Sequence, residues 1–137
     1  MIVNGFWYGS ELGELEKLCI DSWIENGYEF HLWIYDDIEV PNDVVVENAN
    51  HIVSFNQYFT YNEGHSKGTP VAFSNLFTKL ITLYNLKEYV LPKEHFCPVD
   101  WESYKDVLEY KPDSYGLHLY RSLWNQKELK KLISIYL

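Results

Sequence analysis

The chain has few basic residues for its length. Lys and Arg number 11 against 20 Asp and Glu in 137 residues, so the formal net charge is −9. A protein that binds the phosphate backbone of nucleic acid needs the opposite charge. The imbalance therefore argues against nucleic acid as a partner. A small anionic ligand would need local basic groups, a helix N-terminus or a divalent cation.

Cysteine is also scarce, and long apolar runs and secretion signals are missing. The two cysteines, Cys19 and Cys97, do not make a disulfide framework, so we expect free thiols in a reducing compartment. No run reaches the roughly eighteen apolar residues of a transmembrane helix, and no charged-then-apolar leader is present. These features predict a cytoplasmic protein without a transmembrane segment.

Several catalytic and binding motifs are missing as well. The chain has no Walker loop and no Gly-x-Gly-x-x-Gly, which excludes the common phosphate cradles. It has no Gly-x-Ser-x-Gly, and no nucleophile stands at a diagnostic spacing from a histidine, so a hydrolytic triad is not supported. No Cys or His cluster has zinc spacing. Asp-x-Asp, a common metal-binding pattern, does not occur.

Aromatic residues, in contrast, are abundant. The chain holds 5 Trp, 12 Tyr and 7 Phe, and 47% of its residues are hydrophobic, which is typical of a packed fold and not of disorder. Most of these rings are expected to form the core. Tyr and Trp near loops also suit flat ligands such as nucleobases and sugar rings, because they offer a stacking face and a polar group.

The first 37 residues predict a strand–helix–strand unit. A short apolar run at Ile2–Val3 leads into Phe6-Trp7-Tyr8, and a helical pattern follows, with its apolar residues at Leu12, Leu15, Leu18, Cys19 and Trp23. Gly27 is placed to end that helix, and residues 30–35 are rich in aromatic and branched residues, as strands are. Such a unit implies a parallel sheet. Because ligands bind at the carboxyl ends of such strands, we expect Phe6 to Tyr8 and the pair Asp36-Asp37 on the rim of a crevice.

The rest of the chain continues an α/β pattern in one domain. Residues 44–46 predict a third strand, and residues 55–68 a surface loop of functional length. A helix is expected from 71 to 86. Alternation at residues 115–120 predicts a strand, and residues 126–137 an amphipathic helix with Leu129, Leu132, Ile133 and Tyr136 inward. We expect one domain, 1–137, with a nucleotide-binding half at 1–77 and a closing segment at 78–137.

Two groups of polar residues are candidate sites on their chemistry alone. Asp36, Asp37 and Glu39 follow an apolar strand, where carboxylates could hold Mg²⁺ or Mn²⁺; a solvated turn is the favoured alternative. His118, Ser122 and Trp124 could reach a phosphate or its metal with an imidazole, a hydroxyl and an indole N–H. For these three, a hydrogen-bonded histidine and a core tryptophan are the more common situation.

Five stretches together resemble a known family. Ile2–Gly9, Leu15–Trp23 and Tyr28–Asp36 are similar to the amino end of the sugar-binding-region glycosyltransferases, the group with a toxin-type DXD catalytic domain related to glycosyltransferase family 32 and to capsular polysaccharide enzymes. Pro70–Phe77 resembles their helix with the pattern Ala-x-x-Ser-Asp-x-x-Arg. His118–Trp124 resembles their closing His-x-x-x-Ser-x-Trp. The resemblance implies a GT-A fold, a UDP- or GDP-sugar donor, Mn²⁺ or Mg²⁺, and transfer of the sugar to a hydroxyl of a glycan acceptor.

The resemblance also implies roles for single residues. Trp7 matches the position near the nucleotide base, with Phe6 and Tyr8 beside it, and Ser74 matches the serine of the helix pattern. Asn75 stands where the family has an aspartate that binds sugar hydroxyls. The closing residues His118, Ser122 and Trp124 would lie over the diphosphate, and Ser122 would help to hold the metal.

The middle of the family pattern is missing. Thr78 stands where an arginine is expected, and the family's strand that ends in Asp-x-Asp has no counterpart. The sequence therefore predicts a nucleotide-diphospho-sugar transferase sheet of Rossmann type with flanking helices, truncated in the middle. Its expected function is that of a polysaccharide- or glycan-synthesising transferase. The alternative is a non-catalytic remnant that binds a nucleotide or a carbohydrate. A third alternative is a partly folded chain that self-associates.

Overall fold

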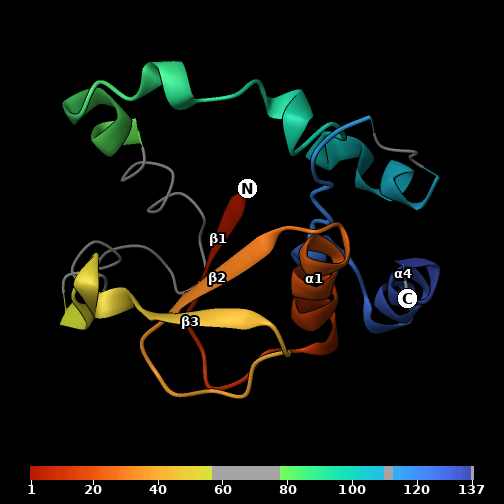
Figure 1. The fold of residues 1–137 in the computed structure, drawn as a ribbon. Coiled ribbons are helices and arrows are strands. Elements are labelled where there is room, and N and C mark those ends of the chain that lie inside the picture. The colour runs from red at the N-terminus through yellow and green to blue at the C-terminus, as the bar shows by residue number, and fades with distance from the viewer. Residues whose placement is uncertain (57–77, 110–112, 137) are drawn as a thin grey trace. The chain divides into compact units, whose positions relative to one another are not determined.

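The computed structural model describes residues 1–56, 78–109 and 113–136. The chain divides into two compact units, Met1–Phe77 and Thr78–Leu137. The first unit holds the sheet and its helix α1, and the second unit is built from short helical segments and the helix α4 (Figure 1). Each unit is described by itself.

The first unit is organised around a three-stranded parallel sheet. Its strands are β1 (Ile2–Trp7), β2 (Glu29–Ile34) and β3 (Val44–Asn48), with β2 in the centre (Figure 1). Trp7 pairs with Ile34, and Ile34 with Asn48, so the carboxyl ends of all three strands meet at one edge. The predictions of an α/β fold, of the parallel strand–helix–strand unit and of a third strand are confirmed.

Helix α1 (Glu14–Glu25) covers one face of this sheet. Leu15, Leu18 and Ile20 are its buried residues. The core cluster contains Leu12 and Ile20 together with Phe30, Leu32 and Ile34 from β2. Burial of such side chains is worth about 1.5–3 kcal/mol each. The expectation that Cys19 lies on the buried apolar face was wrong: Cys19 is exposed, whereas its two neighbours in the chain, Leu18 and Ile20, are buried.

Helix α1 ends just before Gly27, as the sequence predicts. Gly27 has a positive φ of 80°, and its N–H donates to the carbonyl of Ile24 (2.9 Å). The N–H of Tyr28 donates back to the carbonyl of Trp23 (3.1 Å), and the two aromatic rings meet edge to face at 5.4 Å. This pair of bonds with its apolar contact is a Schellman motif. It turns the chain directly into β2.

The opposite face of the sheet carries polar and aromatic side chains. The indole N–H of Trp33 on β2 donates to the Asn4 side-chain oxygen on β1 (2.9 Å). His31 on the same face lies between two carboxylates, with Nε2 at 2.7 Å from Glu29 Oε1 and Nδ1 at 3.3 Å from Glu47 Oε1. These contacts, with Glu29 the largest cause, raise the pKa of His31 above its ordinary value.

The second unit has no strand within its described residues. It contains a helical segment at 78–83, four 3-10 segments, η2 (Lys87–Tyr89), η3 (Lys93–His95), η4 (Trp101–Leu108) and η5 (Arg121–Leu123), and α4 (Gln126–Tyr136). Val99, Val107, Trp124 and Leu132 form its core, with Leu117, Leu119 and Leu129 packed against them.

The predicted strand at 115–120 is not formed. Its alternation is real, because Leu117 and Leu119 both pack on the core of the second unit. The segment nevertheless has no partner strand among the described residues, and Tyr120 has a positive φ of 50°, which is foreign to a strand.

The predicted C-terminal helix is confirmed. Asn125 caps α4, because its side-chain oxygen accepts from the N–H groups of Lys127 and Glu128 (3.0 Å each). The Glu128 carboxylate accepts in return from the Asn125 N–H (3.3 Å), which completes a capping box. Leu132 is fully buried. None of the helices within the described residues is long and apolar enough to cross a bilayer.

Candidate functional site

Aromatic rings gather at the carboxyl edge of the sheet. Tyr35, directly after β2, meets Phe6 of β1 edge to face at 5.8 Å and Phe55 at 5.3 Å. Tyr8, directly after β1, lies 6.0 Å from Phe55. We call Phe6, Tyr8, Tyr35 and Phe55 the edge cluster. It lies at the edge where parallel α/β sheets bind their ligands.

Local hydrogen bonds position two members of the edge cluster, Tyr35 and Phe55. The Tyr35 hydroxyl donates to the carbonyl of Val53 (2.8 Å), and the N–H of Phe55 donates to the Asn50 side-chain oxygen (3.0 Å). Phe6, Tyr8 and Phe55 remain 38%, 45% and 39% exposed. Rings of this kind, fixed at one edge and partly open to solvent, offer stacking surface to a planar ligand.

Trp7 occupies a different position from its two aromatic neighbours. Strand alternation places it on the α1 side of the sheet, where it packs against the core cluster. Its indole N–H donates to the carbonyl of Glu11 (3.1 Å), which secures the loop before α1. The structure therefore brings Phe6 and Tyr8 into the edge cluster and places Trp7 against the core. The role of Trp7 at a nucleotide base stays a prediction.

The acidic pair Asp36-Asp37 lies exposed in the turn after β2. Within residues 1–56, 78–109 and 113–136, no three His, Cys, Asp or Glu side chains come together in a group that could hold a metal ion. The described residues thus form no ready-made cage for the Mn²⁺ or Mg²⁺ that the resemblance implies, and the metal stays a prediction.

The closing residues predicted from the sequence lie in the second unit. Trp124 is buried, meets Tyr104 edge to face at 4.9 Å and donates its indole N–H to the Leu119 carbonyl. His118 packs on the Tyr120 ring with centroids 4.2 Å apart, and the hydration that it loses lowers the pKa of its imidazole. Ser122 is exposed in η5. In this arrangement the indole N–H of Trp124 is used within the unit, while the Ser122 hydroxyl is at the surface.

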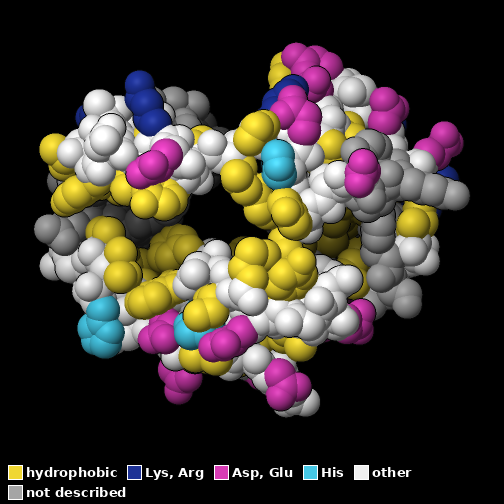
Figure 2. Space-filling view, turned by 45° about the horizontal axis from the view of Figure 1, so that its top comes forward, with side chains coloured by type: hydrophobic (Ala, Val, Ile, Leu, Met, Phe, Trp, Pro, Cys, Tyr) yellow, Lys and Arg dark blue, Asp and Glu magenta, His cyan; other side chains and the backbone are white. Residues whose placement is uncertain are grey.

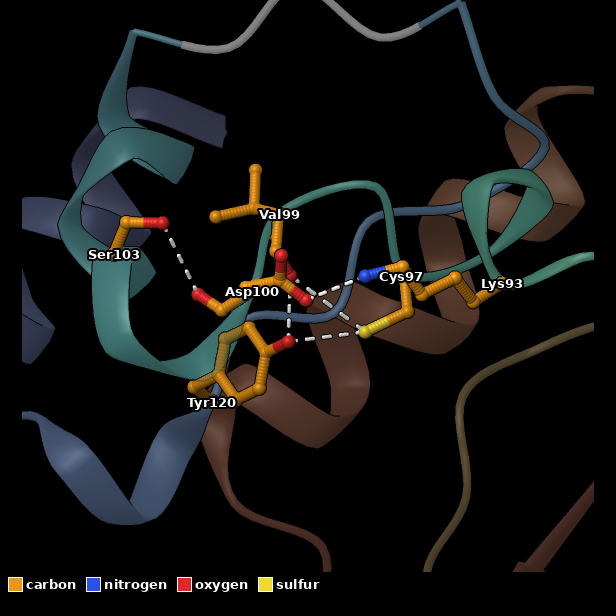
Figure 3. Close-up of polar contacts among 6 residues, drawn as sticks. All are labelled: Lys93, Cys97, Val99, Asp100, Ser103 and Tyr120. Atoms are coloured by element: carbon orange, nitrogen blue, oxygen red, sulfur yellow. Dashed lines mark hydrogen bonds and ion pairs between the residues drawn. The ribbon is translucent and has the colours of Figure 1, made fainter.

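Tyr120 anchors the segment that carries these three residues (Figure 3). Its hydroxyl donates to the Val99 carbonyl (2.6 Å) and lies 3.0 Å from Cys97 Sγ. Loss of hydration, followed by the contact with Cys97, raises the pKa of the Tyr120 hydroxyl to about 12. Next to it, Lys93 pairs with Asp100 at 2.6 Å. Both cysteines of the chain are free thiols.

Sequence reasoning missed two members of the edge cluster. Tyr35 could have been found, because it is the residue that follows an apolar strand in the same parallel sheet as Phe6. Phe55 carried no signal, since its place depends on the turn through η1 (Ala49–His51). Ser74 and Asn75, the predicted donor-binding residues of the central helix, lie outside the described residues. Their roles stay predictions.

The first unit is strongly acidic as a whole. Lys17 is the sole Lys or Arg within residues 1–56, which hold the acidic residues Glu11, Glu14, Glu16, Asp21, Glu25, Glu29, Asp36, Asp37, Glu39, Asp43 and Glu47. For the chain as a whole, Asp and Glu side chains also outnumber Lys and Arg on the face shown in Figure 2. An uncharged ring suits this field better than a bare phosphate does.

The chain was compared with known proteins in three ways. No protein-family model, no curated protein and no solved structure matches it.

Proposed function

We propose that this chain is a nucleotide-sugar-binding domain of the glycosyltransferase type, and that its edge cluster holds the planar base of the donor. The observation that carries this proposal is the group of partly exposed rings, Phe6, Tyr8 and Phe55, at the carboxyl edge of a parallel sheet. The resemblance of the strand–helix–strand unit to the amino end of those transferases supports it.

Binding without catalysis is the form of this function that the described residues favour. They supply rings for stacking but no group of three carboxylates for a metal, and Lys17 is the one Lys or Arg of residues 1–56. A diphosphate would therefore gain little from this unit, whereas the base would gain the stacking energy of about 0.5–1.5 kcal/mol per ring pair. Transfer of the sugar to a hydroxyl acceptor is the second candidate, which the sequence resemblance alone favours.

Calorimetric titration of the full chain with UDP, and with GDP for contrast, tests the proposal. We expect binding that Tyr8→Ala weakens by up to about tenfold, the equivalent of about 1.4 kcal/mol. Tyr84→Ala is the matched control, because Tyr84 is also an exposed tyrosine but belongs to the second unit. Absence of binding of either nucleotide to a sample that unfolds cooperatively would refute the proposal.

Repeating the titration with Mn²⁺ separates the two forms of the function. Affinity that does not change with Mn²⁺ supports a binding module. Affinity that rises strongly with Mn²⁺ supports the catalytic form, and sugar release from UDP- and GDP-sugars would then be measured with Ser122→Ala as the first variant.

A further inference from the structure

The second unit contains a cleft that the sequence motifs did not predict. Its volume is about 440 Å³, and its lining includes Glu94, His95, Asp113, Ser114 and Tyr115. This size lies within the range of small-molecule sites in proteins. We call it the His95 cleft.

Backbone hydrogen bonds fix the two sides of the His95 cleft to each other. The N–H groups of Tyr115 and Gly116 both donate to the His95 carbonyl, at 2.8 and 3.2 Å. The Ser114 hydroxyl donates to the Gly116 carbonyl (2.9 Å), which closes the turn beside Tyr115. The backbone on the two sides of the cleft is therefore held before any ligand arrives, and such preorganisation lowers the entropic cost of binding.

The two rings that line the His95 cleft, His95 and Tyr115, form a layered platform with the neighbouring Phe96. Tyr115 stacks on His95 with centroids 5.7 Å apart and an interplanar angle of 23°, and it lies 5.8 Å from Phe96 at 32°. Tyr115 and Phe96 are 55% and 44% exposed. A cage for a quaternary ammonium needs ring faces that surround one point. Rings this close to parallel instead present a flat apolar surface.

The polar groups of the cleft indicate which kind of ligand it would bind. Glu94 and Asp113 are acceptors when ionised, and bonds from a hydroxyl to a carboxylate are stronger than neutral ones. The same carboxylates repel a phosphate. The cleft therefore suits a ligand with an apolar face that can stack on an aromatic ring and with several hydroxyl groups at its edge. A neutral sugar ring has both features.

We propose that the His95 cleft binds a neutral carbohydrate through a pyranose ring stacked on Tyr115, with its hydroxyls donating to Glu94 and Asp113. This site lies wholly within the second unit. It does not depend on the nucleotide site proposed for the first.

The test is titration of the ¹⁵N-labelled full chain with cellotetraose and with maltotetraose, followed by amide chemical shifts. Sorbitol, which has the hydroxyls without the ring, choline and UDP serve as contrasting probes. We expect at least one tetraose to shift the amides of residues 94–95 and 113–116, and sorbitol not to shift them.

Variants then assign the contact. Tyr115→Ala should weaken binding of the tetraose about tenfold, whereas Tyr115→Phe keeps the ring and should retain it. Asp113→Asn should weaken it by about five- to tenfold, since it removes the charge of the acceptor. Trp101→Ala is the control, because Trp101 is a 61% exposed ring of the same unit that is not part of the cleft lining given above.

Four results would overturn the proposal: no shift with either tetraose, an equal response to sorbitol, a response to choline or UDP in place of the sugars, or tetraose binding that survives both Tyr115→Ala and Asp113→Asn. Tyr8→Ala should leave tetraose binding unchanged. Failure at the nucleotide site and failure at the His95 cleft are therefore distinguishable in the same samples.

Discussion

Gly5 lies beneath a buried ring, and we predict that Gly5→Ala destabilises the first unit. An alanine Cβ at this position would lie 2.7 Å from Phe30 Cζ and 2.9 Å from Phe30 Cε1. Phe30 is 6% exposed and belongs to the core cluster, so its ring cannot move aside freely. Overpacking of this kind costs about 1–3 kcal/mol. Alanine has less chain entropy to lose on folding than glycine, which returns about 0.5–1 kcal/mol. The central expectation is therefore a net loss of about 1 kcal/mol.

A double-mutant cycle isolates the contact between Gly5 and Phe30. Phe30→Leu alone should cost about 1 kcal/mol, since it shortens a buried apolar side chain. In the Phe30→Leu background the clash is removed, so that Gly5→Ala should become neutral or slightly stabilising. The expected coupling between the two substitutions is then about 1–2 kcal/mol.

Urea unfolding followed by circular dichroism, with hydrogen exchange of the β1 and β2 amides to report on the first unit alone, measures each corner of this cycle. A Gly5→Ala variant as stable as the parent chain would refute the reasoning. So would a cost that is equal in both backgrounds, because the loss would then not come from Phe30.

Three further predictions concern a turn, an ion pair and a buried indole. Gly27→Ala should cost about 1 kcal/mol from its positive φ alone, because no atom lies within 4 Å of the added Cβ; Gly27→Asn should cost less in the same urea titration, and an equal cost would contradict the reason given. His31 has a raised pKa in the folded chain, so its contribution to stability is complete below its unfolded pKa of about 6.5 and is lost as pH rises through the folded value. The stability difference between the parent chain and His31→Gln should therefore shrink with rising pH, and Glu29→Gln should weaken that dependence; a difference that grows with pH would exclude this cause. Trp124→Phe should cost about 2 kcal/mol, from a cavity and the lost bond to Leu119; weakened UDP binding with unchanged stability would instead favour the nucleotide role predicted from the sequence.

The elements that the sequence predicts well are those whose signals are local. Residues 29–34 alternate between the α1 face and the opposite face, and Gly27 supplies the positive φ that a Schellman motif requires. The end of α1 and the start of β2 could therefore be predicted from the local sequence alone. Helix α4 is the same case, because Asn125 and Glu128 form its capping box three residues apart.

The predictions that were wrong concern segments whose structure depends on contacts with residues far away in the sequence. Leu117 and Leu119 alternate as in a strand, but a strand also requires a neighbour to accept its hydrogen bonds, and periodicity cannot supply one. The prediction for Cys19 was wrong for a similar reason. An apolar residue on a helix is compatible with burial, and the neighbouring sheet decides which stripe of the helix is covered.

The candidate sites divide in the same way. Strand alternation alone separates Trp7 from Phe6, since adjacent residues of a strand face opposite sides of the sheet, so this distinction was available from the sequence. The meeting of Tyr8 with Phe55, and of Tyr115 with His95, depends on loops that return the chain to an earlier point.

Charge then decides what the two sites can take. The edge cluster belongs to a unit with one lysine within residues 1–56, and the His95 cleft is lined by two carboxylates. Stacking energy is available at both, whereas attraction for phosphate is weak at the first and reversed at the second. A neutral ring should therefore bind at the His95 cleft with no help from cations. A nucleotide at the edge cluster should lose affinity as its phosphates increase from one to three, and titration with UMP, UDP and UTP at low ionic strength would show that order if acidity governs the site.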